Sequence, residues 1–173
     1  MSASTRGPGG GFSLIEVVVS VLIVGGLAVA VLNTIGATAA VRRIDADRAR
    51  GISLAQDLVE EIAGEAYEDP SNGDGSFGSG ADEVATGDRT AFDDVDDYDG
   101  WSASPPEMRD GTALAGFDGW RRTVAVRWSD PTDPDVDKVA ESGLKRVEVS
   151  VYHGSRLVSS MTMLRTAAMD EVR

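Results

Sequence analysis

The segment Gly11-Phe-Ser-Leu-Ile-Glu-Val17 opens an apolar run that continues to Leu32, and Glu16 is the one charged residue in it. A run of this length predicts a helix that crosses a membrane. A charged side chain at membrane depth costs on the order of 2.5 to 3.5 kcal/mol, so an acid inside such a run is by default a functional residue. Glu16 is therefore expected to have a specific use.

The same segment resembles the processing site of type IV prepilins and type II secretion pseudopilins. In that family a membrane prepilin peptidase cuts after the glycine, which is Gly11 in this chain, and methylates the new first residue, Phe12. Glu16 then takes the fifth position of the mature chain, where the family has a glutamate. The stretch Ile52–Ile62 is similar to a segment of minor pilins of the PilV type and of minor pseudopilins.

The resemblance implies a minor pilin or pseudopilin that is assembled into a type IV pilus or a type II secretion pseudopilus. The partners it implies are the prepilin peptidase, other pilins or pseudopilins in a filament, and an assembly platform in the inner membrane. The chain is expected to cross the inner membrane once, with its globular domain outside the cytoplasm, and then to enter the filament. There Glu16 would neutralise the amine of Phe12 in a neighbouring subunit.

An alternative interpretation and one opposing feature bear on this assignment. A secretory signal needs a basic start and a small-residue cleavage site behind the apolar core, but residues 1–10 contain one basic residue, Arg6, and the sites behind the core are weak. The distribution of basic residues favours the opposite orientation, because four arginines follow the apolar run: Arg42, Arg43, Arg48 and Arg50. The processing motif is given more weight than this count.

The order of sequence patterns predicts an α+β, pilin-like fold, in which one long N-terminal helix packs on an antiparallel sheet of about three strands. Residues 1–11 form the leader and residues 12–41 the transmembrane or filament-core helix. Residues 42–67 form an amphipathic helix, with apolar side chains at intervals of three and four: Ala49, Ile52, Ala55, Val59, Ile62 and Ala66. Residues 68–173 form the globular domain.

Within the globular domain, the pattern predicts an acidic loop at 69–118 and a β-sheet at 119–165. Apolar residues alternate from Trp120 to Trp128 and again from Lys145 to Tyr152. The turn at 153–156 then leads into a third strand, which gives a β-hairpin. The stretch 130–135 is expected to be a loop because it is rich in aspartate and proline.

The acidic loop contains five aspartates that are candidate metal ligands, among four large apolar residues: Asp93, Asp94, Asp96, Asp97 and Asp99. The favoured interpretation is that the aromatic rings pin the loop to the core while the carboxylates face solvent. The other is that the carboxylates hold Ca²⁺, which prefers oxygen ligands. A second candidate calcium loop fits an EF-hand only in part, because Phe77 replaces its central glycine: Asn72, Asp74, Ser76, Gly78 and Glu83.

Composition restricts the function. The net charge of −13 disfavours nucleic-acid binding, and the absence of cysteine excludes disulfides and thiolate metal sites. The sole histidine, His153, is expected to be an exposed turn residue, and no nucleophile or phosphate-binding motif is present, so an enzyme is not expected. The alternative function is an exported, membrane-anchored binding protein that uses the same processing route, with the acidic aromatic loop as its ligand or calcium site.

Overall fold

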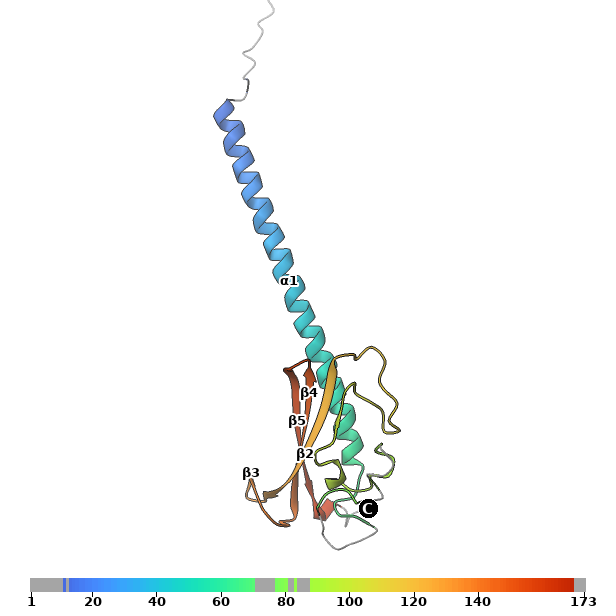
Figure 1. Cartoon of the computed structure of the whole chain (residues 1–173). Helices are drawn as coiled ribbons and strands as arrows, with labels where there is room; N and C mark the ends of the chain where they lie inside the picture. The colour runs from blue at the N-terminus through green and yellow to red at the C-terminus, as the bar shows by residue number, and fades with distance from the viewer. Residues whose placement is uncertain (1–10, 12, 71–76, 81–82, 84–87, 170–173) are drawn as a thin grey trace, which may run out of the picture. The chain divides into compact units, whose positions relative to one another are not determined.

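The computed structural model describes residues 11, 13–70, 77–80, 83 and 88–169. They form an α+β fold in which one long N-terminal helix and a small antiparallel sheet are the main elements, as predicted (Figure 1). The chain divides into two compact units, Met1–Ile44 and Asp45–Arg173. In chain order the elements are α1 (Leu14–Ala63), the short 3-10 helix η1 (Asp96–Tyr98), β1 (Ser102–Ala103), β2 (Trp120–Asp130), β3 (Asp133–Asp137), β4 (Leu144–His153), β5 (Arg156–Thr166) and the 3-10 helix η2 (Ala167–Met169).

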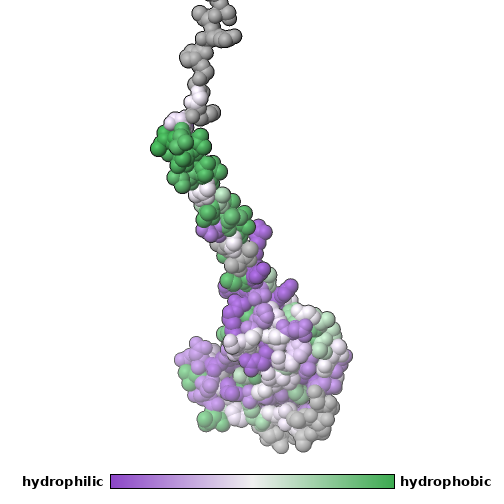
Figure 2. All heavy atoms as spheres, turned by 45° about the horizontal axis from the view of Figure 1, so that its top comes forward, coloured by the Kyte–Doolittle hydropathy of each residue, from purple (hydrophilic) through white to green (hydrophobic). Residues whose placement is uncertain are grey.

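Helix α1 has 50 residues and is therefore about 75 Å long. It ends at Ala63, a few residues before the predicted end at 67. Large apolar side chains in its first half are exposed: Leu14 is 83% exposed and Leu32 is 67% exposed. Figure 2 shows mostly hydrophobic residues along this half, densest at its start and interrupted further along. By length and composition the helix could cross a membrane, and its most apolar window is not buried by any part of the structure.

The sheet has the strand order β1-β2-β4-β5, with β3 paired to β2, and every pairing is antiparallel. The three long strands are the predicted ones. The prediction of a loop at 130–135 was wrong for residues 133–135, because these residues belong to β3, which begins at Asp133 and pairs with β2. Asp130 closes the tight turn by accepting a hydrogen bond from the Thr132 N–H at 2.8 Å, and Arg146 donates to the Pro134 carbonyl at 2.6 Å. These contacts outweigh the poor strand propensity of aspartate and proline.

The core lies between the second half of α1 and one face of the sheet. The predicted helix stripe was partly wrong: Ala55 and Ile62 are fully buried, but Ile52 is 38% exposed, and Leu54 and Leu58 take the remaining core positions. Opposite them lie the apolar residues of β2 and β4, which include Val124, Val126, Val147, Val149 and Val151. The helix approaches β5 so closely that a Cβ on Gly51 would lie 2.8 Å from Val158 Cγ1, which explains the glycine at this position.

Candidate functional site

The acidic loop is attached to the end of α1 and to the core. The Val95 N–H donates to the Ala66 carbonyl at 3.0 Å, and the Ala66 N–H donates to the Asp93 carbonyl at 3.2 Å. Phe92 and Tyr98 are buried, with their ring centroids 5.0 Å apart in an edge-to-face arrangement. The prediction that aromatic residues pin this loop to the core is therefore confirmed.

The prediction that the carboxylates of this loop face solvent was wrong. Asp94, Asp96 and Asp97 are only 2% to 3% exposed. The loop turns its own N–H groups toward them: Asp94 accepts from the N–H groups of Asp96 and Asp97 at 2.7 and 3.2 Å, and Asp97 accepts from those of Asp93 and Asp94 at 2.9 and 3.1 Å. Hydrogen bonds of this kind offset much of the cost of removing a carboxylate from water.

A buried ion pair ties the loop to the sheet. Lys145, the second residue of β4, pairs with Asp96, and both side chains are 3% exposed. The same ammonium donates to the Tyr67 carbonyl and lies 4.4 Å from the centroid of the Tyr67 ring. Asp96 also accepts from the Gly78 N–H at 2.9 Å. No sequence pattern indicates this pair, because Lys145 and Asp96 are far apart along the chain and a lysine at a strand start is ordinarily exposed.

A buried arginine links the loop to α1. Arg89 is fully buried, and its Nε donates to Glu61 on α1 at 2.8 Å. The Tyr98 hydroxyl donates to the same carboxylate oxygen at 3.0 Å. The Arg89 guanidinium also lies 4.2 Å from the centroid of the Trp101 ring, a cation–π geometry. The acidic loop therefore has a defined conformation, held to α1 as well as to β4.

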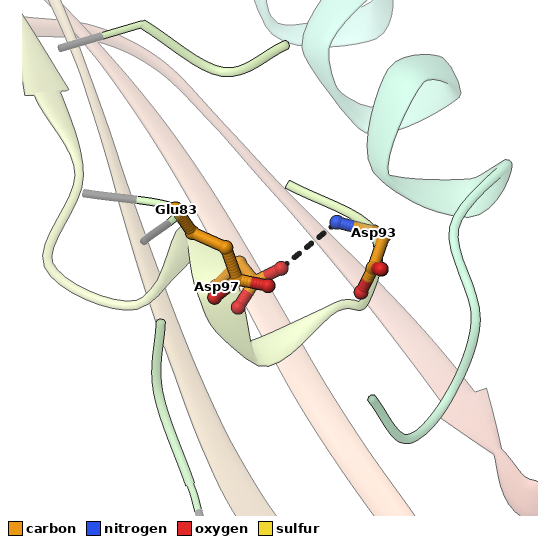
Figure 3. Close-up of side chains that lie close together, drawn as sticks. All are labelled: Glu83, Asp93 and Asp97. Atoms are coloured by element: carbon orange, nitrogen blue, oxygen red, sulfur yellow. Dashed lines mark hydrogen bonds between the residues drawn. The ribbon is translucent and has the colours of Figure 1, made fainter. Parts of the chain in front are cut away.

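Three carboxylates of this region lie close together. One oxygen from each of Glu83, Asp93 and Asp97 lies within 4.8 Å of the others, and Figure 3 shows the Asp93 N–H directed at the Asp97 carboxylate. Burial, together with the charges of Asp97 and Asp93, raises the pKa of Glu83 to about 7. Oxygen ligands at this spacing could hold a hard cation such as Ca²⁺.

The structure brings together only some of the predicted metal ligands. Asp93 and Asp97 join Glu83, whereas Asp94 and Asp96 are engaged by backbone N–H groups and Lys145. Asp99 lies apart and accepts from the Val126 N–H at 2.9 Å and from Arg127 at 2.7 Å. Of the EF-hand-like set, Gly78 and Glu83 are described, and Asn72, Asp74 and Ser76 lie outside the described residues.

A pocket of about 550 Å³ opens beside the acidic loop and the β1 segment. Its lining combines the rings of Phe92 and Trp101 with the carboxylates of Asp88, Asp97 and Glu107. Such a lining suits a ligand that carries a positive charge next to an apolar group.

His153 has the exposed position expected for it. Its side chain is 41% exposed, its ring stacks on Trp120 with centroids 4.6 Å apart, and its Nδ1 lies 3.3 Å from an Asp47 carboxylate oxygen. That oxygen also accepts from Arg156 at 2.8 Å. The contacts give the histidine a packing role between α1 and the β4–β5 hairpin.

The residues of the processing motif lie at the start of α1. Gly11 is exposed, and Glu16 is an exposed residue of the first turn, its N–H donating to the Ser13 carbonyl at 2.9 Å. Phe12 and the rest of the predicted leader, residues 1–10, lie outside the described residues. The position of Glu16 suits an acid, because the N-terminal end of a helix stabilises negative charge.

No family model matches the chain, and comparison with curated proteins and with solved structures gives no match either. The resemblance to prepilins therefore depends on the sequence motif and remains a prediction.

The buried Asp94 carboxyl predicts a contribution to stability that falls as pH rises. Burial, together with the charges of Asp96 and Asp97, raises the pKa of Asp94 to about 8, above its ordinary value of 3.8. The folded state then binds a proton more tightly than the unfolded state, so stability is greatest below about pH 4 for this group and is lost up to about pH 8. Asp94→Asn keeps the acceptor oxygen but does not ionise, so its melting temperature should fall less over this range than that of the natural chain.

Melting temperatures measured from pH 4 to pH 8 in a chelator test this. Asp110→Asn is the control, because Asp110 is exposed and the Thr112 N–H lowers its pKa. The melting temperature of Asp110→Asn should fall with rising pH as much as that of the natural chain. Parallel profiles for Asp94→Asn and the natural chain would contradict the prediction.

Proposed function

We propose that this chain is a minor pilin or pseudopilin subunit that prepilin peptidase cleaves after Gly11 and that is then assembled into a type IV pilus or a type II secretion pseudopilus. The observation that carries the proposal is the juxtaposition of Gly11-Phe-Ser-Leu-Ile-Glu16 with the start of α1. A glycine that fits the cut site of the prepilin motif and an acid in the first turn of an apolar helix occur together in this segment.

The exposed apolar half of α1 supports an assembly function. Large side chains there remain substantially open to solvent, such as Leu22 at 69% and Ile35 at 60%. Burying apolar surface is worth roughly 25 cal/mol per Å², so this half favours an apolar environment strongly. The lipid bilayer supplies that environment before assembly, and the helices of neighbouring subunits supply it in a filament.

Glu16 has a use in that environment. A carboxylate buried in lipid or among apolar helices needs a positive partner, because an uncompensated buried charge destabilises by about 3 to 5 kcal/mol. Cleavage after Gly11 creates a positive amine at Phe12, four residues before Glu16. In the proposed filament, the Glu16 carboxylate of one subunit pairs with the Phe12 amine of a neighbour.

The N-terminus of the native protein tests the processing step. The intact mass of protein purified from its native membrane should correspond to a chain that begins at Phe12, with or without one added methyl group. Gly11→Val should retain the leader because the peptidase loses its cut site, whereas Gly9→Val is the matched control and should be processed. A native chain that begins at Met1, or beyond Ala28, would contradict the proposal.

Replacing Glu16 separates processing from assembly. Glu16→Ala should give the same mature mass as the natural chain. Its incorporation into sheared filaments should drop about 100-fold or more, because the neighbour's amine is left without its partner at a cost of about 3 kcal/mol. Ser20→Ala removes a polar group one turn further along α1 and should assemble normally. Normal incorporation of Glu16→Ala would argue against the pairing.

A second candidate is a membrane-anchored binding protein with Ca²⁺ or another cationic ligand in the acidic loop. The cluster of Glu83, Asp93 and Asp97 and the adjoining pocket favour it. The raised pKa of Glu83 also suits cation binding, because a bound cation offsets the repulsion between these carboxylates. Its discriminating feature is the absence of the protein from filaments.

Calcium addition tests the ion site. A ligand at 100 times its Kd stabilises the folded state by about 2.7 kcal/mol, so millimolar Ca²⁺ should raise the melting temperature by several degrees. Asp97→Asn should abolish this rise, and Asp135→Asn, on the exposed strand β3, should leave it intact. An unchanged melting temperature of the natural chain in millimolar Ca²⁺ would remove the ion site.

A further inference from the structure

Four arginines form a collar on α1 just after its apolar half. Within nine residues the helix carries two acids and the four members of this arginine collar: Arg42, Arg43, Arg48 and Arg50. All four arginines are exposed. Among the residues that the structure describes, none of them takes part in an ion pair, and the nearby Asp47 is engaged by Arg156. Figure 2 shows hydrophilic residues on α1 beyond its hydrophobic half.

The collar contrasts in charge with the rest of the protein. Residues 1–50 contain five of the 16 basic residues and three of the 29 acidic residues, so residues 51–173 carry a net charge of −15. A single anionic surface would therefore attract the collar and repel the domain that follows it.

The spacing along α1 places the collar at one face of a bilayer. Measured from Leu14 at 1.5 Å per residue, Arg42 lies about 42 Å along the helix axis and Arg50 about 54 Å. A bilayer is about 40 to 45 Å thick including its headgroups. When α1 spans a bilayer from Leu14, the collar begins at the headgroups and ends about 9 to 14 Å beyond them, which is between one and two Debye lengths of roughly 8 Å.

The directions of the arginines distinguish a lipid surface from a protein partner. At about 100° per residue, Arg43, Arg48 and Arg50 point roughly 100°, 240° and 80° away from Arg42 around the helix. Arg42, Arg43 and Arg50 therefore lie within one sector of about 100°, where a protein docked on one side of α1 could contact them, whereas Arg48 lies outside that sector. A headgroup layer surrounds the helix and can contact all four arginines.

We propose that the arginine collar is a binding site for the phosphate groups of anionic phospholipids. Guanidinium groups bind phosphate oxygens through paired hydrogen bonds in addition to charge. Bound at the headgroups, the collar sets how far α1 enters the bilayer, and repulsion of the acidic domain by the same surface keeps that domain clear of it. The inference requires α1 to span a bilayer but requires neither cleavage after Gly11 nor assembly.

The natural absence of cysteine allows a direct test. Ala46→Cys, exposed within the collar, carries a fluorophore in the full chain reconstituted into vesicles. The vesicles contain either phosphatidylcholine alone or phosphatidylcholine with one third phosphatidylglycerol. A water-soluble quencher should reach the label about fivefold less well in the anionic vesicles, since each arginine near such a surface contributes a factor of about this size. At 1 M salt, where the Debye length is about 3 Å, the difference should disappear.

Two charge-matched variants provide the control. Arg42→Gln/Arg43→Gln/Arg50→Gln leaves only Arg48 of the collar and should therefore lose most of the response to phosphatidylglycerol. Arg121→Gln/Arg127→Gln/Lys138→Gln, which removes the same charge from exposed positions of the sheet domain, should keep it. Resistance to carbonate extraction verifies insertion of both variants, since neither alters the apolar half of α1.

Three outcomes would overturn the inference. With all four arginines present, the quencher could reach the label equally well in both kinds of vesicle. Alternatively, the collar variant could keep the full response to phosphatidylglycerol. The response could also depend on the protein-to-lipid ratio and not on phosphatidylglycerol, which would assign the collar to carboxylates of neighbouring copies. Failure of processing or of filament entry would leave the inference standing, because neither step enters this measurement.

Discussion

One continuous helix has to satisfy two environments, and the rest of the structure follows from that constraint. The first half of α1 is apolar on all sides, so it favours lipid or neighbouring helices. The second half is apolar on one side only, where Leu54, Leu58 and Ile62 are buried against the sheet. The change from a fully apolar to an amphipathic pattern occurs around the arginine collar, and it determines where the globular domain begins.

The acidic loop shows how a highly charged segment can become part of a core. Its aromatic residues supply apolar area, while Lys145, Arg89 and the loop's own N–H groups compensate the buried carboxylates. Compensation is incomplete, because burial and the neighbouring acids still raise the pKa of Asp94 and Glu83. A segment held by such contacts has a defined conformation and is also sensitive to protons. The sensitivity comes from placing like charges together in a region of low polarity.

Periodicity predicted the helix and the three long strands, because those elements repeat a pattern over many residues. The wrong predictions concern positions where a single contact between distant parts of the chain determines burial or strand formation. The carboxylate of Asp96 was expected to face solvent, since nothing in its own segment shows that Lys145, on β4, pairs with it. Strand β3 was expected to be loop, because the contacts of Arg146 are invisible in the composition of residues 133–137. Asp93 and Asp97 of the candidate ion site were predicted from the sequence together with Asp94, Asp96 and Asp99. The sequence does not distinguish these two groups, because the other three aspartates bind different partners only in the folded structure.

The charges at the two ends of the apolar segment bear on the conflict over orientation. Glu16 lies at one end and the arginine collar at the other, so a count of basic residues favours a cytoplasmic collar. That rule is strongest for short loops, whereas long domains are translocated largely regardless of charge. Here 123 residues follow Arg50, and they carry an excess of acids. Phosphate groups lie at both faces of a phospholipid bilayer, so a collar that binds headgroups is compatible with either orientation. The collar therefore does not oppose the orientation that the processing motif implies.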